Sequence, residues 1–273
     1  MPADIAAAPP RPTLLDYAYR GQPLLAATGM LMLLTLIPTM LAFALDGRVL
    51  NGVSVWIKPL KFEVSLAIHL LTVAWLMLCL PEEIRARRTA RGFAIALAAA
   101  SIFEIAYIAF QASRGEASHF NVATPIAGLM YTLMGVGALT LVIASVGVGI
   151  QILRHGDRRN PIVFAAGLGI VLGNLLGGLT GMYMSNQTGH WVGGLQTDAG
   201  GVPIFGWSRS GGDLRVAHFF GLHLMQALPI AAWLARDAVA ERLQRPLVIG
   251  LAILGTLVTA GTWLQAVHGL PLL

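Results

Sequence analysis

The sequence predicts an all-α integral membrane protein with seven transmembrane helices, and three observations predict this class. Of the 273 residues, 56% are hydrophobic and only 11% are charged, against roughly 25% charged residues in an average soluble domain. The mean hydropathy is +0.71. The apolar residues gather into seven runs near the length of about 20 residues that a bilayer requires. These runs cover residues 24–45, 55–80, 93–112, 124–152, 161–184, 214–235 and 247–268.

Residues 1–23 are rich in proline and alanine, and we interpret them as a cytoplasmic leader ahead of a single transmembrane domain over 24–273. The Ala-Phe-Ala at residues 42–44 resembles a signal-peptide cleavage site. The length of the first run and the region ahead of it favour a retained anchor instead. The single cysteine, Cys79, excludes an intrachain disulfide. The longest polar interval, at about 185–213, is too short to bury a core of its own.

The distribution of arginine predicts the orientation. The leader and the loops 81–92, 153–160 and 236–246 hold 12 of the 18 basic residues, which places them in the cytoplasm. Seven spans then put the amino terminus inside and the carboxyl terminus outside the plasma (inner) membrane. The net charge of +5 is therefore interpreted first as a signal of membrane orientation, and we expect no nucleic-acid partner.

The remaining basic residues fall at the predicted outer side, where the positive-inside tendency should have thinned them. Six of the seven histidines do the same, His155 being the exception. An extracytoplasmic polar site is the simplest common cause, although for Arg48 an ordinary wet loop is an adequate explanation. The outer basic residues are Arg48, Lys58, Lys61, Arg114, Arg209 and Arg215.

The run 55–80 carries a polar stripe that reaches from the outer mouth past the bilayer midplane. At 100° per residue its members lie within about 80° of one another. They are Lys58, Lys61, Ser65, His69 and Thr72. For Lys58 the alternative is that its side chain extends along the helix and places the ammonium group at the membrane interface. Glu63 lies off the stripe, so we expect it to pair with a neighbouring helix or reach the interface.

The run 93–112 places Glu104 about 12 Å below its outer end, at 1.5 Å per residue. A carboxylate at that depth is costly unless it is protonated or paired. Gln111 and Arg114 share its side of the helix, and His119 and Asn121 follow in the next loop. We expect this group to contact a substrate, with interhelical hydrogen bonding as the alternative for Gln111.

The run 161–184 repeats glycine every four residues, a spacing typical of close helix packing. The glycines are Gly169, Gly173, Gly177 and Gly181. The loop at 185–213 that follows, with His190, has the length of a functional lid. It delivers Asp213 to the start of the next helix, where an N-cap role is the leading interpretation. With Arg215 beside it, the same helix start suits an anionic group.

The run 214–235 carries two histidines and a glutamine, His218, His223 and Gln226. The histidines are about 140° apart at 100° per residue, so they need not bind the same ion. We expect this helix to form one wall of the site, opposite Lys61, His69 and Glu104.

Our first hypothesis for this set is a metal-assisted hydrolase or transferase that acts on an anionic, lipid-like amphiphile. A divalent ion, with zinc expected, would be held by His69, His223 and Glu104 and would activate water. The catalytic residues would be Glu104, His218 and Ser65. The substrate would be bound by Lys58, Lys61, Gln111, Arg114, His119, Asn121, His190, Asp213, Arg215 and Gln226.

The Ser65-xxx-His69 spacing is similar to the S-xxx-H motif in the second helix of the ceramidase and adiponectin-receptor superfamily, which also has seven spans. That resemblance implies a zinc-dependent membrane hydrolase. The paired histidines of that superfamily are spaced H-xxx-H on the last helix, whereas His218 and His223 lie on the sixth. Glu104 stands where an aspartate is expected.

Two further hypotheses remain open. In one, His69 and a histidine of the sixth helix ligate a b-type haem, and the polar mouth binds a quinone, as in a membrane oxidoreductase. In the other, the chain is a receptor or transporter whose histidines form a pH-sensitive gate. Membrane lipids are expected partners in each case, and a homo-oligomer is compatible with all three.

Overall fold

The computed structural model describes residues 12–273, and seven of the helices in that range are long and apolar enough to cross a membrane. The mostly helical, seven-span architecture predicted from the sequence is therefore confirmed. These helices are α2 (Pro23–Leu45), α3 (Ile57–Leu76), α5 (Arg88–Arg114), α6 (Pro125–His155), α7 (Pro161–Ser185), α8 (Leu214–Ala235) and α9 (Glu241–Val267).

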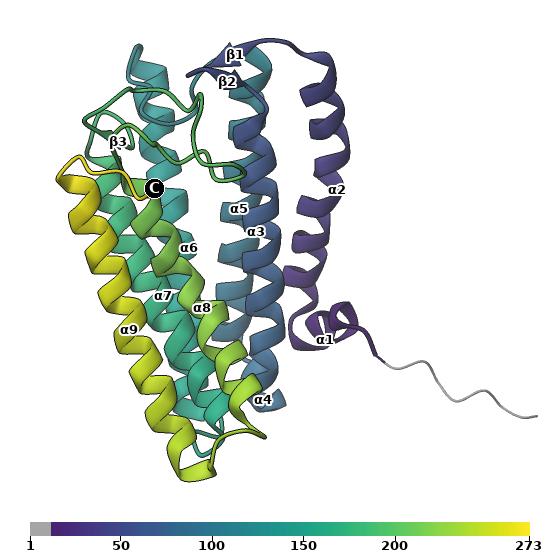
Figure 1. Cartoon of the computed structure of the whole chain (residues 1–273). Helices are drawn as coiled ribbons and strands as arrows, with labels where there is room; N and C mark the ends of the chain where they lie inside the picture. The colour runs from purple at the N-terminus through teal and green to yellow at the C-terminus, as the bar shows by residue number, and fades with distance from the viewer. Residues whose placement is uncertain (1–11) are drawn as a thin grey trace, which may run out of the picture.

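Short elements connect the long helices. They are α1 (Leu14–Gly21), the 3-10 turn η1 (Met77–Cys79), α4 (Glu82–Arg85), and the two-residue strands β1 (Val49–Leu50), β2 (Val53–Ser54), β3 (Trp191–Val192) and β4 (Gly212–Asp213). The strands pair as β1–β2 and β3–β4, both antiparallel. Both pairs lie at one end of the bundle, which we call the hairpin end, and α1 and α4 lie toward the opposite, arginine-rich end (Figure 1).

The predicted leader falls partly outside the described residues, which begin at Pro12. The part that is described forms α1, an amphipathic helix whose amino end is capped by Thr13. Gly21 at its end lies against the backbone of Ala74 in α3, where a side chain would have no room. The leader is therefore packed onto the bundle at its carboxyl-terminal part.

Local sequence explains where the long helices begin. Thr124 and Asn160 accept hydrogen bonds from backbone amides as N-caps, and each is followed by a proline at the first helical position. The helix α5 begins at Arg88, five residues before the predicted run, and α9 begins at Glu241, six residues before it. Charged residues extend both helices because Arg and Glu favour helical backbone while their charges remain at the interface.

Helices that follow one another along the chain pack side by side, and Figure 1 shows α2, α3 and α5 on one side of the molecule with α6 to α9 on the other. A single large apolar core joins the two groups, including Leu70, Leu97, Ile152 and Ile170. Polar side chains of α3, α5, α6 and α8 lie above this core toward the hairpin end.

The contact between α7 and α8 is closest because glycine removes side chains from both helices. A Cβ at Gly173 would lie 3.0 Å from both the Leu222 carbonyl oxygen and the Met225 amide nitrogen. One at Gly221 would lie 2.9 Å from the Gly177 nitrogen. The packing role predicted for the glycine repeat is confirmed, and it fixes α8 in position beneath the candidate site.

Replacing Gly173 by leucine should therefore destabilise the protein by about 1–3 kcal/mol or more, the cost of overpacking, because backbone and not a flexible side chain blocks the space. Thermal unfolding in detergent measures the effect. The matched control is Gly250→Leu on α9, where nothing lies within 4 Å of the position that a Cβ would take. Equal melting temperatures for the two variants would contradict the close α7–α8 contact.

Candidate functional site

The segment 186–213, which we call the lid, folds over the hairpin end. Its two ends pair through β3 and β4, with Trp191 opposite Asp213. Its middle is attached to the other side of the bundle, because Asp198 donates its backbone N–H to the carbonyl of Asn51 at 2.9 Å. The predicted loop is thus an ordered structure that bridges the β1–β2 turn and the start of α8.

Arg215 is the centre of the interactions that hold the lid. Its guanidinium donates to both carboxylate oxygens of Asp213, at 2.9 and 2.7 Å. It also lies 2.8 Å from Asp198 Oδ1 and donates to the carbonyl of Gly206 at 2.8 Å. Bidentate pairing of this kind suits the planar guanidinium. One arginine therefore joins the helix start to two distant points of the lid.

Asp213 also has the N-cap role predicted for it. Its Oδ1 accepts the backbone N–H of Arg215 at 3.0 Å, and its Oδ2 accepts that of Ser208 at 2.9 Å. The side chain is only 3% exposed. Because both of its oxygens accept hydrogen bonds from the lid or the start of α8, Asp213 organises the lid.

His190 and Asp198 form a second, weaker link within the lid. His190 Nε2 lies 3.3 Å from Asp198 Oδ1, and the imidazole stacks on Trp191 with ring centroids 3.8 Å apart. Burial lowers the pKa of His190 below its ordinary 6.5, although the hydrogen bond with Asp198 opposes the shift. Burial alone would raise the pKa of Asp198, but that hydrogen bond and the charge of Arg215 outweigh it and lower the pKa below 3.8.

Lys58 and Lys61 lie beneath the lid with much of their donor capacity unused. An ammonium group has three N–H donors. Lys61 Nζ donates to the carbonyl of Phe205 at 2.7 Å, and Lys58 Nζ lies over the ring of Phe62 at 5.8 Å from the centroid. Within residues 12–273 neither lysine forms a salt bridge, because Asp198 and Asp213 are both paired with Arg215.

An aromatic cluster from the lid and α8 borders the lysines. Phe205 stacks on Trp207 with centroids 4.4 Å apart, and both rings contact Phe219 edge-on. Phe220 completes the cluster, and Val202 and Val216 pack with it. Phe205 and its neighbour Ile204 are exposed, so this apolar edge of the lid is accessible from outside.

Glu104 lies deeper, on α5. It is 3% exposed, and its Oε1 has no hydrogen-bond partner within the described chain. The carboxyl group lies directly against Gly137 of α6, where a Cβ would be 2.5 Å from Oε1. Lys58 carries the positive charge that acts on Glu104. Gly137 thus provides the space in which this carboxyl group sits.

The three histidines of the bundle lie below the lysines. His218 Nδ1 donates to the Gly177 carbonyl of α7 at 2.8 Å, and His223 Nδ1 donates to the Phe219 carbonyl at 2.8 Å. His69 Nε2 lies 2.9 Å from the Ser145 hydroxyl of α6. A carbonyl can only accept, so both α8 histidines carry a hydrogen on Nδ1, and in the neutral ring Nε2 then holds the lone pair.

Two further predicted residues lie on facing surfaces of α3 and α8. Gln226 donates from Nε2 to the Thr72 hydroxyl at 3.3 Å, and its buried Oε1 has no partner among the described residues. Ser65 is exposed on α3, and no hydrogen bond from its hydroxyl is found in the described chain. It therefore has no base in hydrogen-bond reach that would activate it as a nucleophile.

Three predicted substrate contacts are instead engaged with the loop that follows α5. Gln111 donates to the Ala117 carbonyl at 3.2 Å, and Asn121 donates to the same oxygen at 3.1 Å. Arg114 is exposed and pairs with Glu116 at 2.8 Å. Local loop geometry accounts for these residues, and the structure does not bring them to the lysines.

His119 in the same loop is closer to the site. Its ring lies 5.8 Å from that of Phe62 and 6.0 Å from that of Tyr131. Burial, with a contribution from the nearby charge of Lys58, lowers the pKa of His119 to about 3. The imidazole is therefore neutral at physiological pH and forms part of the aromatic surround of Lys58.

The geometry gives the predicted zinc site no support. Within residues 12–273, no three side chains of His, Cys, Asp or Glu are grouped so that they could hold a metal ion. His69 and His223 are close enough to interact electrostatically, but Glu104 does not join them. Zinc binding by these three residues stays a prediction.

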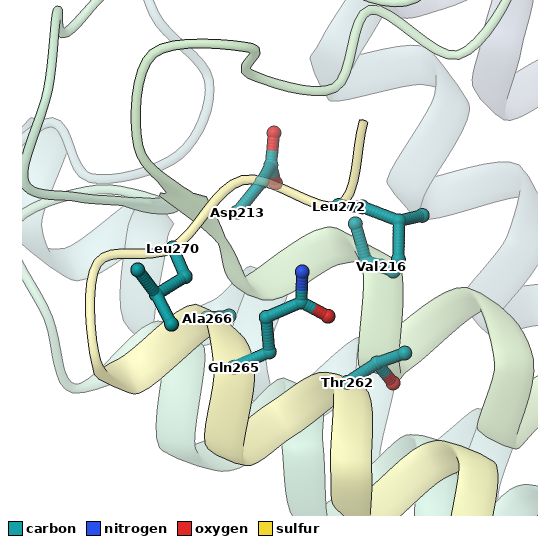
Figure 2. Close-up of a pocket in the computed structure, with 7 residues that line it drawn as sticks. All are labelled: Asp213, Val216, Thr262, Gln265, Ala266, Leu270 and Leu272. Atoms are coloured by element: carbon teal, nitrogen blue, oxygen red, sulfur yellow. The ribbon is translucent and has the colours of Figure 1, made fainter.

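A small cleft between the start of α8, the end of α9 and the carboxyl-terminal tail lies near the lid (Figure 2). Gln265 in this cleft donates to the carbonyl of Pro271, and a Cβ at Gly212 would collide with the backbone of Ala266. Figure 2 shows the Asp213 carboxyl group pointing away from Gln265 and Thr262. The cleft is thus a packing seam that holds the tail against the lid.

Several residues that shape the site were missed in the sequence. Asp198 and the carbonyl of Phe205 belong to the lid, and Ser145 and Gly137 belong to α6. Helical periodicity does not apply to the lid, and a single serine or glycine in an apolar helix carries no signal of its partner. The polar residues that recur every three or four positions along α3 predicted one wall of the site. They did not identify the residues of the lid and of α6 that those side chains contact.

Comparison with known protein families, with curated proteins and with solved structures finds no match for this chain.

The lid should loosen in acid. Because the pKa of His190 and that of Asp198 are both lower in the folded lid than their ordinary values, the stability they contribute is complete above about 6.5 and is lost as the pH falls. Hydrogen exchange, corrected for the intrinsic pH dependence, should show falling protection of residues 190–198 below that pH. The variant His190→Gln keeps an N–H donor but cannot titrate. The loss of protection that begins near pH 6.5 should therefore be absent in this variant. Constant protection in the wild type would contradict the assignment.

Proposed function

We propose that this chain is a membrane-embedded hydrolase or transferase that binds the anionic headgroup of an amphiphile on the extracytoplasmic side of the plasma (inner) membrane. The observation that carries the proposal is the pair of lysines beneath the lid. Lys58 and Lys61 have unused N–H donors and no salt bridge within the described chain. A phosphate or carboxylate headgroup supplies the acceptors and the charge that both ammonium groups lack.

The surroundings of the lysines favour an amphiphile over a small soluble anion. The exposed apolar residues Val64, Ile68 and Trp75 lie on α3 about 60–100° from the centre of the polar stripe at 100° per residue. A tail lying in the bilayer along this strip would have its headgroup beside Lys61. The exposed edge of the lid at Ile204 and Phe205 adds a second apolar surface at the same level.

The side of the membrane follows from the arginines. The loops at the arginine-rich end and residue Arg20 hold most of the basic residues, and the positive-inside tendency places that end in the cytoplasm. The amino terminus would then lie inside, the carboxyl terminus outside, and the lid would face outward. An outer-leaflet lipid or a lipid-like molecule is the substrate class that this orientation favours.

Glu104 and the histidines would supply the chemistry below the headgroup. Among the described residues one buried carboxyl oxygen of Glu104 has no hydrogen-bond partner, which suits a group that gives or takes a proton. His223 presents a free Nε2 lone pair, the form needed for a general base or a metal ligand. If a zinc ion binds at His69 and His223, it would activate water for attack on the substrate.

The same histidine geometry fits a second candidate equally well, a haem-binding oxidoreductase. Histidines that ligate metals usually donate their other ring nitrogen to a carbonyl or carboxylate, which fixes the tautomer. His218 and His223 both do so through Nδ1. A receptor or transporter with a histidine gate would use the same pocket. No observation on the described residues favours it over the other two candidates.

Replacing Lys58 and Lys61 together by glutamine should weaken binding of an anionic lipid by about tenfold per lysine, since a hydrogen bond to a charged group contributes about 1.5–3 kcal/mol. Titration of detergent-purified protein with a fluorescent phosphatidic acid, with phosphatidylcholine as the neutral comparison, measures the affinity. Arg209→Gln is the matched control, because Arg209 is an exposed lid cation without a salt bridge in the described chain.

Equal affinity of the double variant and the wild type would contradict the headgroup site. The absorption spectrum and zinc content of the same preparation separate the candidate chemistries. A Soret band that is lost in His223→Ala would select the haem protein, whereas stoichiometric zinc lost in His223→Ala and Glu104→Ala would select the hydrolase.

A further inference from the structure

Glu63 is a buried carboxyl group that lies outside the candidate site. It is located on α3 about half a helical turn away from the Lys61 stripe, and it faces α2. Only 1% of its surface is exposed. Thr39 of α2, itself 6% exposed, is its hydrogen-bond partner, with 2.7 Å between Thr39 Oγ1 and Glu63 Oε1.

The hydrogen bonds around Thr39 can be counted. A threonine hydroxyl carries one hydrogen. Thr39 Oγ1 lies 3.0 Å from the Thr35 carbonyl oxygen as well as 2.7 Å from Glu63 Oε1. That hydrogen can go to only one of these two acceptors. If it goes to the Thr35 carbonyl, the 2.7 Å contact with Glu63 is a hydrogen bond only when a proton on Oε1 makes Glu63 the donor; if it goes to Oε1, the carboxyl group accepts.

The second carboxyl oxygen gives independent support for that proton. Glu63 Oε2 is buried and has no hydrogen-bond partner among the described residues. The nearby Thr35 hydroxyl donates instead to the Met32 carbonyl at 2.8 Å. An ionised carboxylate with one hydrogen bond at most would be costly in hydrocarbon, whereas a neutral acid leaves only a carbonyl oxygen unpaired.

No charge in the surrounding helices compensates an ionised Glu63. The helix α2 contains no charged residue over its whole length. Lys58 and Lys61 lie on the other face of α3, and Glu63 forms no salt bridge within residues 12–273. On α5, which packs against both helices, Glu104 is the buried charged residue, and it lies against Gly137 of α6.

We propose that Glu63 is a membrane-buried proton-binding site at the α2–α3 interface, in which a protonated carboxyl group shares a hydrogen bond with Thr39. Such a carboxyl group is a modification site for hydrophobic carbodiimides. The acid O–H adds across one C=N bond: a bond forms from the carboxyl oxygen to the central carbon and the proton passes to nitrogen. The resulting O-acylisourea rearranges to a stable N-acylurea without loss of an atom.

Dicyclohexylcarbodiimide labelling of the full chain in membranes tests the proposal. We expect an adduct on the peptide that contains Glu63 in the wild type and in Glu104→Gln, and at least a tenfold loss of that adduct when a water-soluble carbodiimide is used. Glu63→Gln should lack it. The Glu104→Gln control separates this carboxyl group from the candidate site, so the result does not depend on the proposed function.

The absence of an adduct on Glu63 would overturn the proposal. Protection of Glu63 by Na⁺ would also overturn it, because the oxygens of Glu63 and Thr39 would then be holding a cation and not a proton. Thermal unfolding gives a second readout. As the pH rises above neutral, the melting temperature of the wild type should fall, whereas that of Glu63→Gln should stay constant, and parallel curves would contradict a bound proton.

Discussion

The structure at the hairpin end depends on how Arg215 is neutralised. A guanidinium at the start of a membrane-spanning helix needs counterions, and it takes both Asp213 and Asp198. Asp213 also caps α8, so the same carboxylate fixes the helix start and the arginine. Because Asp198 belongs to the middle of the lid, the ion pairs hold the lid over the bundle. Within the described residues this arrangement leaves Lys58 and Lys61 without a salt bridge, and the proposed headgroup site rests on that observation.

Below the lid, the polar groups are satisfied by different means. His218 and His223 donate to backbone carbonyls, and His69 pairs with Ser145. Backbone carbonyls that accept a second hydrogen bond let a membrane helix carry imidazole without an opposing charge. The two buried glutamates differ, since Glu104 lies within reach of the charge of Lys58 and Glu63 is hydrogen-bonded to the neutral Thr39. We therefore propose separate roles for the two carboxyl groups.

Much of the fold was predictable because each span is a local property of about twenty residues. The polar face of α3 was likewise predictable, since 3.6 residues per turn places Lys58, Lys61 and His69 together. The partners of those residues were not predictable. Asp198 reaches Arg215 through an irregular loop, and Ser145 reaches His69 from a helix that shows no polar pattern. Gln111 and Arg114 shared a face with Glu104, yet the loop after α5 engages both. Residue spacing predicts which face of a helix a side chain lies on, but it does not predict which residue of another segment that side chain contacts.

If Arg215 holds the lid and so forms the anion site beneath it, removing its charge should release both. Hydrogen exchange of the lid in Arg215→Gln, compared with Arg114→Gln, tests this most directly, because Arg114 forms an exposed ion pair at the same end of the bundle. We predict that Arg215→Gln loses protection over residues 191–208 and also loses affinity for phosphatidic acid, since breaking a buried ion pair costs about 3–5 kcal/mol. Arg114→Gln should change neither, because an exposed pair contributes about 0–1 kcal/mol. Full lid protection in Arg215→Gln would contradict the role of Arg215 as the residue that holds the lid.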